Sequence, residues 1–190
     1  MLLRNILALS LLTFATAAMA DGIDLNLRNS SAQFQYNTSM GRDTLGKTEF
    51  HIGALYSDAN NSHNTLGDLG VEVKDEVGSK APGFSVGVGI KGVLGHTQGT
   101  NESAVALGAM LRYSPPGLTR LGLIGQVYFA PNITTFSDAN RYVESSARVE
   151  FTVIPNAAAY IGYRNIYFNL NNGPTVTVDD GAFIGVRMSF

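Results

Sequence analysis

The 190-residue chain contains no cysteine and no tryptophan, and only 15% of its residues are charged. Without cysteine, it is neither a disulfide-stapled secreted module nor a lipoprotein anchored through a cysteine after its signal. With 13 Lys and Arg against 15 Asp and Glu, it has no basic tract, which excludes nucleic acid as a partner. After residue 20, no apolar run reaches the roughly 20 residues of a membrane-spanning helix. A membrane location would therefore require a closed β-barrel.

The first twenty residues have the pattern of an export signal. Arg4 supplies a positive start, residues 6–15 are apolar, and Ala18-Met19-Ala20 offers a small-x-small cleavage site. The apolar stretch is too short for a membrane anchor. We predict a signal peptide at 1–20 and one domain at 21–190, with a mature net charge near −3 because removing Arg4 leaves 12 basic residues against 15 acidic ones.

The rest of the chain is dominated by strict alternation of apolar and polar residues, the period of a β-strand with one apolar face. Phe84, Val86 and Val88, for example, alternate with Ser85 and Gly87. The same pattern recurs in 46–57, 69–74, 84–91, 105–113, 121–129, 142–153, 157–170 and 176–190. In 23–36 its phase shifts across residues 29–31, as expected for a bulge in one strand or a tight hairpin between two.

The connections predict a topology. The segments 58–65, 95–103, 131–140 and 171–180 are longer and polar, whereas 77–83, 114–119 and 154–157 are shorter and contain proline. Outer-membrane barrels have long outer loops, short periplasmic turns and an even number of strands. The sequence thus predicts an all-β, antiparallel up-and-down transmembrane barrel of about ten strands. The alternative is eight, if 23–38 contributes none.

The polar faces carry charges of both signs, with many glycines between them. Such charges are too costly to bury unpaired, so they must face water or one another. In a barrel they would line the lumen, and in a soluble periplasmic β-protein they would cover the outer surface. Under the barrel interpretation, the lumen charges are Lys47, Glu49, His51, Glu72, Lys74, Arg112, Glu144, Arg148, Glu150, Arg164 and Arg187.

The segments "VYFAPNITTFSDANRYVESSARVEFTVIP", "YIGYRNIYFNL" and "GAFIGVRMSF" resemble the YfaZ family of Gram-negative outer-membrane proteins. The resemblance implies an outer-membrane location and a barrel architecture, and it brings no catalytic residues. The last segment also resembles the assembly signal of such barrels, with Gly185, Met188 and Phe190 in the key positions. Met188 stands where an aromatic residue is usual. The implied partners are the barrel-assembly machinery, outer-membrane lipid and lipopolysaccharide.

The titratable residues do not form a recognisable catalytic or metal site. His51 shares a strand face with Glu49, whereas His63 and His96 fall in predicted loops. A neighbour pair along one strand is not the arrangement of nucleophile, base and orienting group that a hydrolase needs. No spacing of histidines and carboxylates matches a metal site. We therefore predict no enzyme, no metal and no cofactor.

Two functions remain open. The first is a structural or surface-interaction barrel whose charged lumen is largely plugged, because eight to ten strands leave little room inside. The second is a narrow porin-like channel for small solutes.

Overall fold

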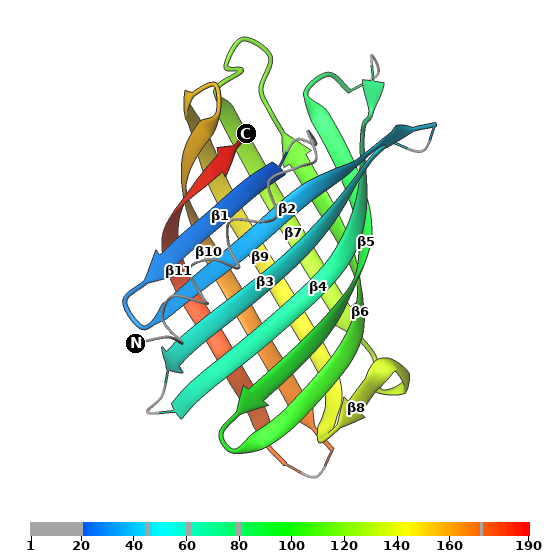
Figure 1. Ribbon diagram of the computed structural model, residues 1–190, viewed down its shortest axis with the longest axis vertical. Helices are drawn as coiled ribbons and strands as arrows, with labels where there is room; N and C mark the ends of the chain where they lie inside the picture. The colour runs from blue at the N-terminus through cyan, green and yellow to red at the C-terminus, as the bar shows by residue number, and fades with distance from the viewer. Residues whose placement is uncertain (1–20, 45, 60–61, 79–80, 172) are drawn as a thin grey trace, which may run out of the picture.

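The computed structural model describes residues 21–44, 46–59, 62–78, 81–171 and 173–190, so the predicted signal peptide lies outside the described residues. The described chain is a closed antiparallel barrel of ten strands (Figure 1). Its strands are β1 (Asp21–Arg28), β2 (Ser31–Asp43), β3 (Gly46–Ala59), β4 (Ser62–Glu76), β5 (Phe84–Thr97), β6 (Thr100–Tyr113), β7 (Leu121–Ala130), β9 (Ala139–Ile154), β10 (Ala157–Leu170) and β11 (Thr175–Ser189). A 3-10 turn (Asn132–Thr134) and the short β8 (Thr135–Ser137) lie between β7 and β9.

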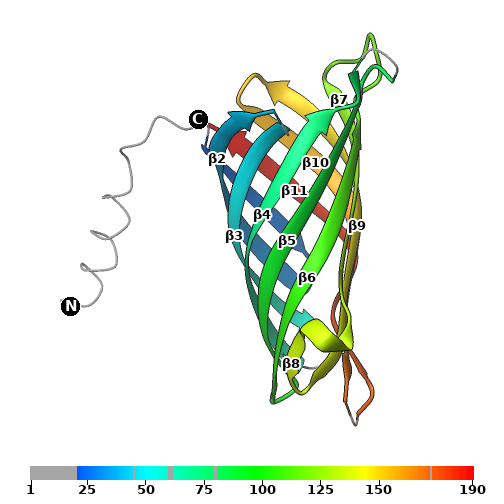
Figure 2. The same ribbon diagram turned by 90° about the vertical axis from the view of Figure 1, so that its right-hand side faces the viewer.

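The barrel is closed where its first and last strands meet. β1 pairs antiparallel with β11, so that Gly22 lies opposite Ser189. Two further backbone hydrogen bonds join Asp21 to Phe190, with N···O distances of 3.1 and 2.9 Å. Asp21 and Phe190 therefore lie at one end of the barrel, which we call the terminal end, and the opposite end is the distal end (Figures 1 and 2).

The phase shift near the start of the chain is a hairpin. β1 and β2 pair from Asp21 with Thr38 to Arg28 with Ser31, which leaves only residues 29–30 as the turn. The segment therefore contributes two strands, and the prediction of ten is confirmed.

The predicted contrast in loop length is wrong. At the distal end, Asp58 still pairs with His63 and Thr97 with Thr100, so segments expected to be loops continue the strands. Gln98 and Gly99 form a tight two-residue turn with φ values of 50° and 84°, as type I′ hairpins require. Polar residues can continue the backbone hydrogen bonding of two strands beyond the part with an apolar outer face. The amino-acid composition of such strand ends is the same as that of loops, so the sequence alone does not distinguish them. The distal connection that stays long is 131–138, which carries β8 (Figure 2).

The apolar faces of the strands point outward. Large side chains remain exposed around the barrel, among them Leu107 at 66% and Val88 at 65%. A soluble sandwich would pack these faces against each other, whereas here they form the outer wall. Among the residues that the structure describes, no helix is long and apolar enough to cross a membrane.

Candidate functional site

The barrel interior is filled by layers of side chains, and the distal half holds an apolar layer. Tyr142 and Phe168 are fully buried there, with ring centroids 4.8 Å apart. The layer consists of Leu55, Leu66, Val93, Ala104, Ala106, Tyr128, Ala130, Ala139, Tyr142, Ile166, Phe168 and Val178. Sequence reasoning missed it, because it treated every inward face as polar.

A buried ion pair lies next to this layer. Lys91 pairs with Glu144, which also accepts a hydrogen bond from the Tyr142 hydroxyl. The Lys91 ammonium lies 4.3 Å from the centroid of the Tyr128 ring, a favourable cation–π arrangement. Nearby, His51 Nε2 is 3.6 Å from Asp68 Oδ1, and both residues are buried. Lys91 and Glu144, and His51 and Asp68, are therefore paired with one another inside the lumen.

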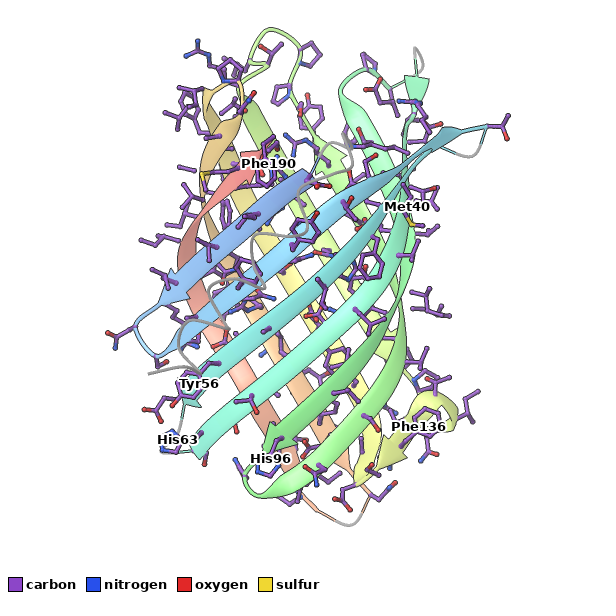
Figure 3. The ribbon with its side chains drawn as sticks, in the orientation of Figure 1. Met40, Tyr56, His63, His96, Phe136 and Phe190 are labelled. Carbon is purple, nitrogen blue, oxygen red and sulfur yellow. The ribbon has the colours of Figure 1, made fainter. Side chains whose placement is uncertain are left out.

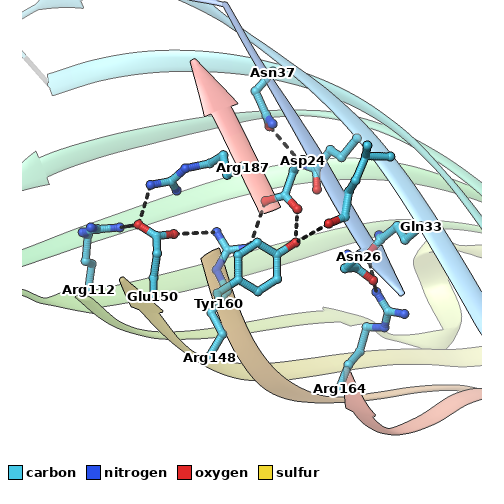
Figure 4. A network of polar contacts seen from close by, with 12 residues as sticks. Asp24, Asn26, Gln33, Asn37, Arg112, Arg148, Glu150, Tyr160, Arg164 and Arg187 are labelled. Carbon is cyan, nitrogen blue, oxygen red and sulfur yellow. Dashed lines mark hydrogen bonds and ion pairs between the residues drawn. The ribbon is translucent and has the colours of Figure 1, made fainter. Parts of the chain in front are cut away.

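A second buried cluster centres on Asp179. Arg164 donates to Asp179 Oδ2 from Nε at 2.9 Å and from Nη2 at 2.6 Å, and Arg28 Nη1 donates to Oδ1 at 2.8 Å. Arg164 also donates to Asn26 Oδ1 at 3.1 Å and to the side chain of Gln33 (Figure 4). The cluster ties β1 and β2 to β10 and β11, the four consecutive strands around the closing pair.

At the terminal end, three arginines surround two carboxylates; we call this group the arginine wall (Arg112, Arg148, Arg187, Glu150 and Asp24). Glu150 Oε1 accepts from Arg112 Nη1 at 3.0 Å and from Arg187 Nη2 at 2.5 Å. Arg148 donates to Asp24 Oδ2 at 3.1 Å, and its Nη2 lies 3.9 Å from Glu150 Oε2 (Figure 4). The five side chains come from β1, β6, β9 and β11, so the wall links strands on different sides of the closing pair.

A second charged group, the lysine wall, consists of Lys47, Glu49, Glu72 and Lys74 on β3 and β4. Glu49 pairs with Lys47 at 3.0 Å and with Lys74 at 2.8 Å, and Lys74 is 3.5 Å from Glu72. The two walls line one cavity of about 430 Å³, together with residues at the start of β1 and the end of β11. The terminal end therefore contains a polar cup, and the apolar layer lies in the distal half.

The structure places the eleven sequence-derived lumen charges on the inner face. Their signs suggest pairing of Glu144, Arg148 and Glu150 with Arg112, Arg164 and Arg187 across the lumen, and this expectation holds only in part. Glu150 does meet Arg112 and Arg187. Glu144 instead pairs with Lys91, Arg148 with Asp24, and Arg164 with Asp179. Asp24 could have been predicted as a lumen charge from the sequence, because it alternates with the apolar residues Ile23 and Leu25. Asp179 has the same inward parity as Arg187, but the sequence predicts a loop at 171–180; the register shift opposite Ile166 and Tyr167 lies on the N-terminal side of Asp179.

The histidines at the distal end lie on strands, which corrects the expectation that they are in loops. His63 Nδ1 lies 2.9 Å from the Tyr56 hydroxyl and 3.3 Å from Asp58 Oδ1, and His96 Nδ1 lies 2.8 Å from Asn101 Oδ1 (Figure 3). Within the described ranges, no three His, Cys, Asp or Glu side chains are grouped to hold a metal ion.

The three residues assigned to the assembly signal differ in environment. Met188 and Phe190 are exposed, Phe190 at the terminal end of the barrel (Figure 3). Gly185 instead lies under the ring of Tyr160, which a Cβ atom at that position would strike. A glycine at position 185 thus also has a packing reason.

Comparison with known families identifies the chain. The model of the family described as "YfaZ precursor" matches residues 3–190. The chain belongs to the YfaZ family. The match includes the predicted signal segment, in keeping with a precursor, and the YfaZ family together with the closed barrel fits a small outer-membrane protein.

No curated protein matches the YfaZ chain. A solved structure titled "Unveiling the Mechanism Behind the in-meso Crystallization of Membrane Proteins" aligns with 90% of it and 83% of its own chain, at 11% identity and a TM-score of 0.44.

Proposed function

We propose that this YfaZ chain is a non-conducting barrel of a Gram-negative outer membrane, with a structural and surface-interaction role. The observation that carries the proposal is the apolar layer across the distal half of the lumen. Its aromatic members Tyr128, Tyr142 and Phe168 are each no more than 1% exposed. Protein interiors packed in this way contain few voids larger than a water molecule, so solutes have no hydrated path through this layer.

The buried ion pairs of the lumen support the same function. A conducting pore needs charged groups that stay hydrated and exchange with passing ions. Here Lys91 and Glu144 hold each other beneath the aromatic rings, and Arg164 is bound by Asp179. The first pair joins β5 to β9 across the lumen, and the second joins the neighbouring strands β10 and β11.

The proposed contacts lie on the outside of the barrel. The exposed apolar wall fits outer-membrane lipid, and at the distal end Ile133 and Phe136 are 86% and 56% exposed. Because barrels of this class keep both termini in the periplasm, the distal end would face lipopolysaccharide. We further propose that the last strand is read by the barrel-assembly machinery, and that the barrel has no catalytic role.

Conductance of the refolded mature protein in planar bilayers tests the closed lumen. We expect background current across both polarities, because the apolar layer excludes water. Incorporation should be verified by recovering the protein from matched vesicles and observing the mobility shift between unheated and heated samples on a gel. A reproducible open level would contradict the proposal and support the alternative, a narrow channel for small solutes.

A further inference from the structure

The polar cup at the terminal end is balanced in charge overall but divided into two regions. On the arginine wall, three guanidinium groups face only two carboxylates. Across the cup, the lysine wall pairs two lysines with two carboxylates. Asp21, at the rim, adds one more carboxylate to the cavity lining. A ligand with a net charge would disturb this balance, whereas one carrying both charges would match it.

Unused hydrogen-bonding atoms are concentrated around this cavity. Four of the eight buried side-chain atoms without a partner in the described part of the chain belong to Asp21, Glu72, Arg148 and Glu150. Asp21, Glu72 and Arg148 line the cup, and Glu150 lies within the arginine wall. Glu72 is the clearest case, because its side chain is only 8% exposed and its Oε1 accepts no hydrogen bond. Leaving such an acceptor buried and unpaired costs free energy.

The arginine wall has donors to spare. Each guanidinium carries five N–H donors. Within the described residues, Arg112 and Arg187 each give one hydrogen bond to a side chain, and Arg148 Nε is buried without an acceptor. The fork of a guanidinium matches the two oxygens of a carboxylate. The cup thus offers donors on one wall and an unpaired carboxylate oxygen on the other.

We propose that the cup binds a small zwitterion of the amino-acid or short-peptide class. Its carboxylate would lie against the arginine wall, and its ammonium group would donate to Glu72. The cavity of about 430 Å³ falls in the size range of small-molecule sites. This binding goes beyond the structural role proposed above and holds whether or not the lumen conducts.

Titration calorimetry on the detergent-solubilised barrel tests the proposal with whole and half ligands. The probes are L-serine and diglycine, compared with acetate and methylammonium, which each present one of the two charged groups. We expect at least one zwitterion to bind at least tenfold more tightly than either half ligand, because only it engages both walls. This comparison uses the wild-type protein and needs no variant to fold.

Two substitutions locate the site. Glu72→Gln and Arg187→Gln should each weaken binding of the zwitterion about tenfold, the usual effect of losing one charge-assisted hydrogen bond. The matched controls are Glu76→Gln and Arg42→Gln at the same end. Arg42 forms an exposed ion pair with Asp75 at 2.7 Å and does not line the cup, so binding should be unchanged. The heat-dependent gel shift verifies that each variant is folded.

Three results would overturn the proposal. Acetate binding as tightly as serine would make the cup a plain anion site. Methylammonium binding as tightly would make it a cation site. Absence of heat with all four probes would mean that the cup holds only water.

Discussion

At the scale of single residues, glycine makes the interior of this narrow barrel possible. Gly108 on β6 lies under the ring of Tyr128, so closely that a Cβ atom there would collide with it. Tyr128 in turn lies beside Lys91 and is part of the apolar layer. A small residue on one strand therefore provides the space for a large one on its neighbour.

Gly108→Ala should lower the free energy of unfolding by about 1–3 kcal/mol, the usual cost of overpacking a core. Urea unfolding in detergent micelles measures it. The control is Gly125→Ala, whose added Cβ would meet no atom within 4 Å, and its stability should stay at the wild-type value. Equal stability of the two variants would show that the Tyr128 ring moves aside without cost.

At the scale of elements, β5 shows how one strand separates two environments. Ile90 and Val88 are exposed on the outer wall, whereas Lys91 is 5% exposed in the lumen. The lysine at position 91 faces the lumen, where Glu144 pairs with its charge. The flanking positions face outward, where a charged side chain would have no partner.

Ile90→Arg should destabilise the inserted barrel by about 2–4 kcal/mol, as expected for a basic side chain facing lipid near the bilayer midplane. The measurement is reversible unfolding in lipid vesicles. Leu118→Arg serves as the control, because Leu118 is 61% exposed in the connection between β6 and β7 and lies outside the strands. Wild-type stability of Ile90→Arg in vesicles would contradict an outer wall that faces lipid.

The alternation of apolar and polar residues predicts well which segments are strands. It predicts only part of the set of residues that face the lumen. It works for β5 because glycines and a lysine alternate with valines and an isoleucine. It misses Leu55 and Val93, which face inward beside outward Tyr56 and Leu94, so that the two faces show no contrast there. It misses Leu66 because this residue falls between the predicted connection 58–65 and the predicted strand 69–74. The partners of a lumen charge depend on how the strands are staggered around the barrel, which local sequence does not show: Lys91 on β5 pairs with Glu144 on β9, which is not its neighbour in the sheet.

At the scale of the whole molecule, the barrel combines two unlike halves. The distal half is stabilised as a soluble core is, by buried aromatic and aliphatic side chains. The terminal half is held by charged groups around a cavity. Stability should accordingly depend most on side chains in the distal half.

Phe168→Ala should cost about 3–5 kcal/mol in unfolding free energy, because it removes a fully buried ring and leaves a cavity. Thermal or urea unfolding provides the value. Phe136→Ala is the matched control, since Phe136 is 56% exposed on β8, and it should change stability by less than about 1 kcal/mol. A small effect of Phe168→Ala would mean that the distal half repacks readily.

The pairing of β1 with β11 also has a consequence for the order of events during biogenesis. Gly22 cannot meet Ser189 until the intervening strands have been delivered, so ring closure is a late step that depends on contacts far apart in the sequence. Until then, both outermost strands present unpaired edges that invite aggregation. We therefore expect the unpaired edges of β1 and β11 to be the most aggregation-prone part of the chain until the barrel closes.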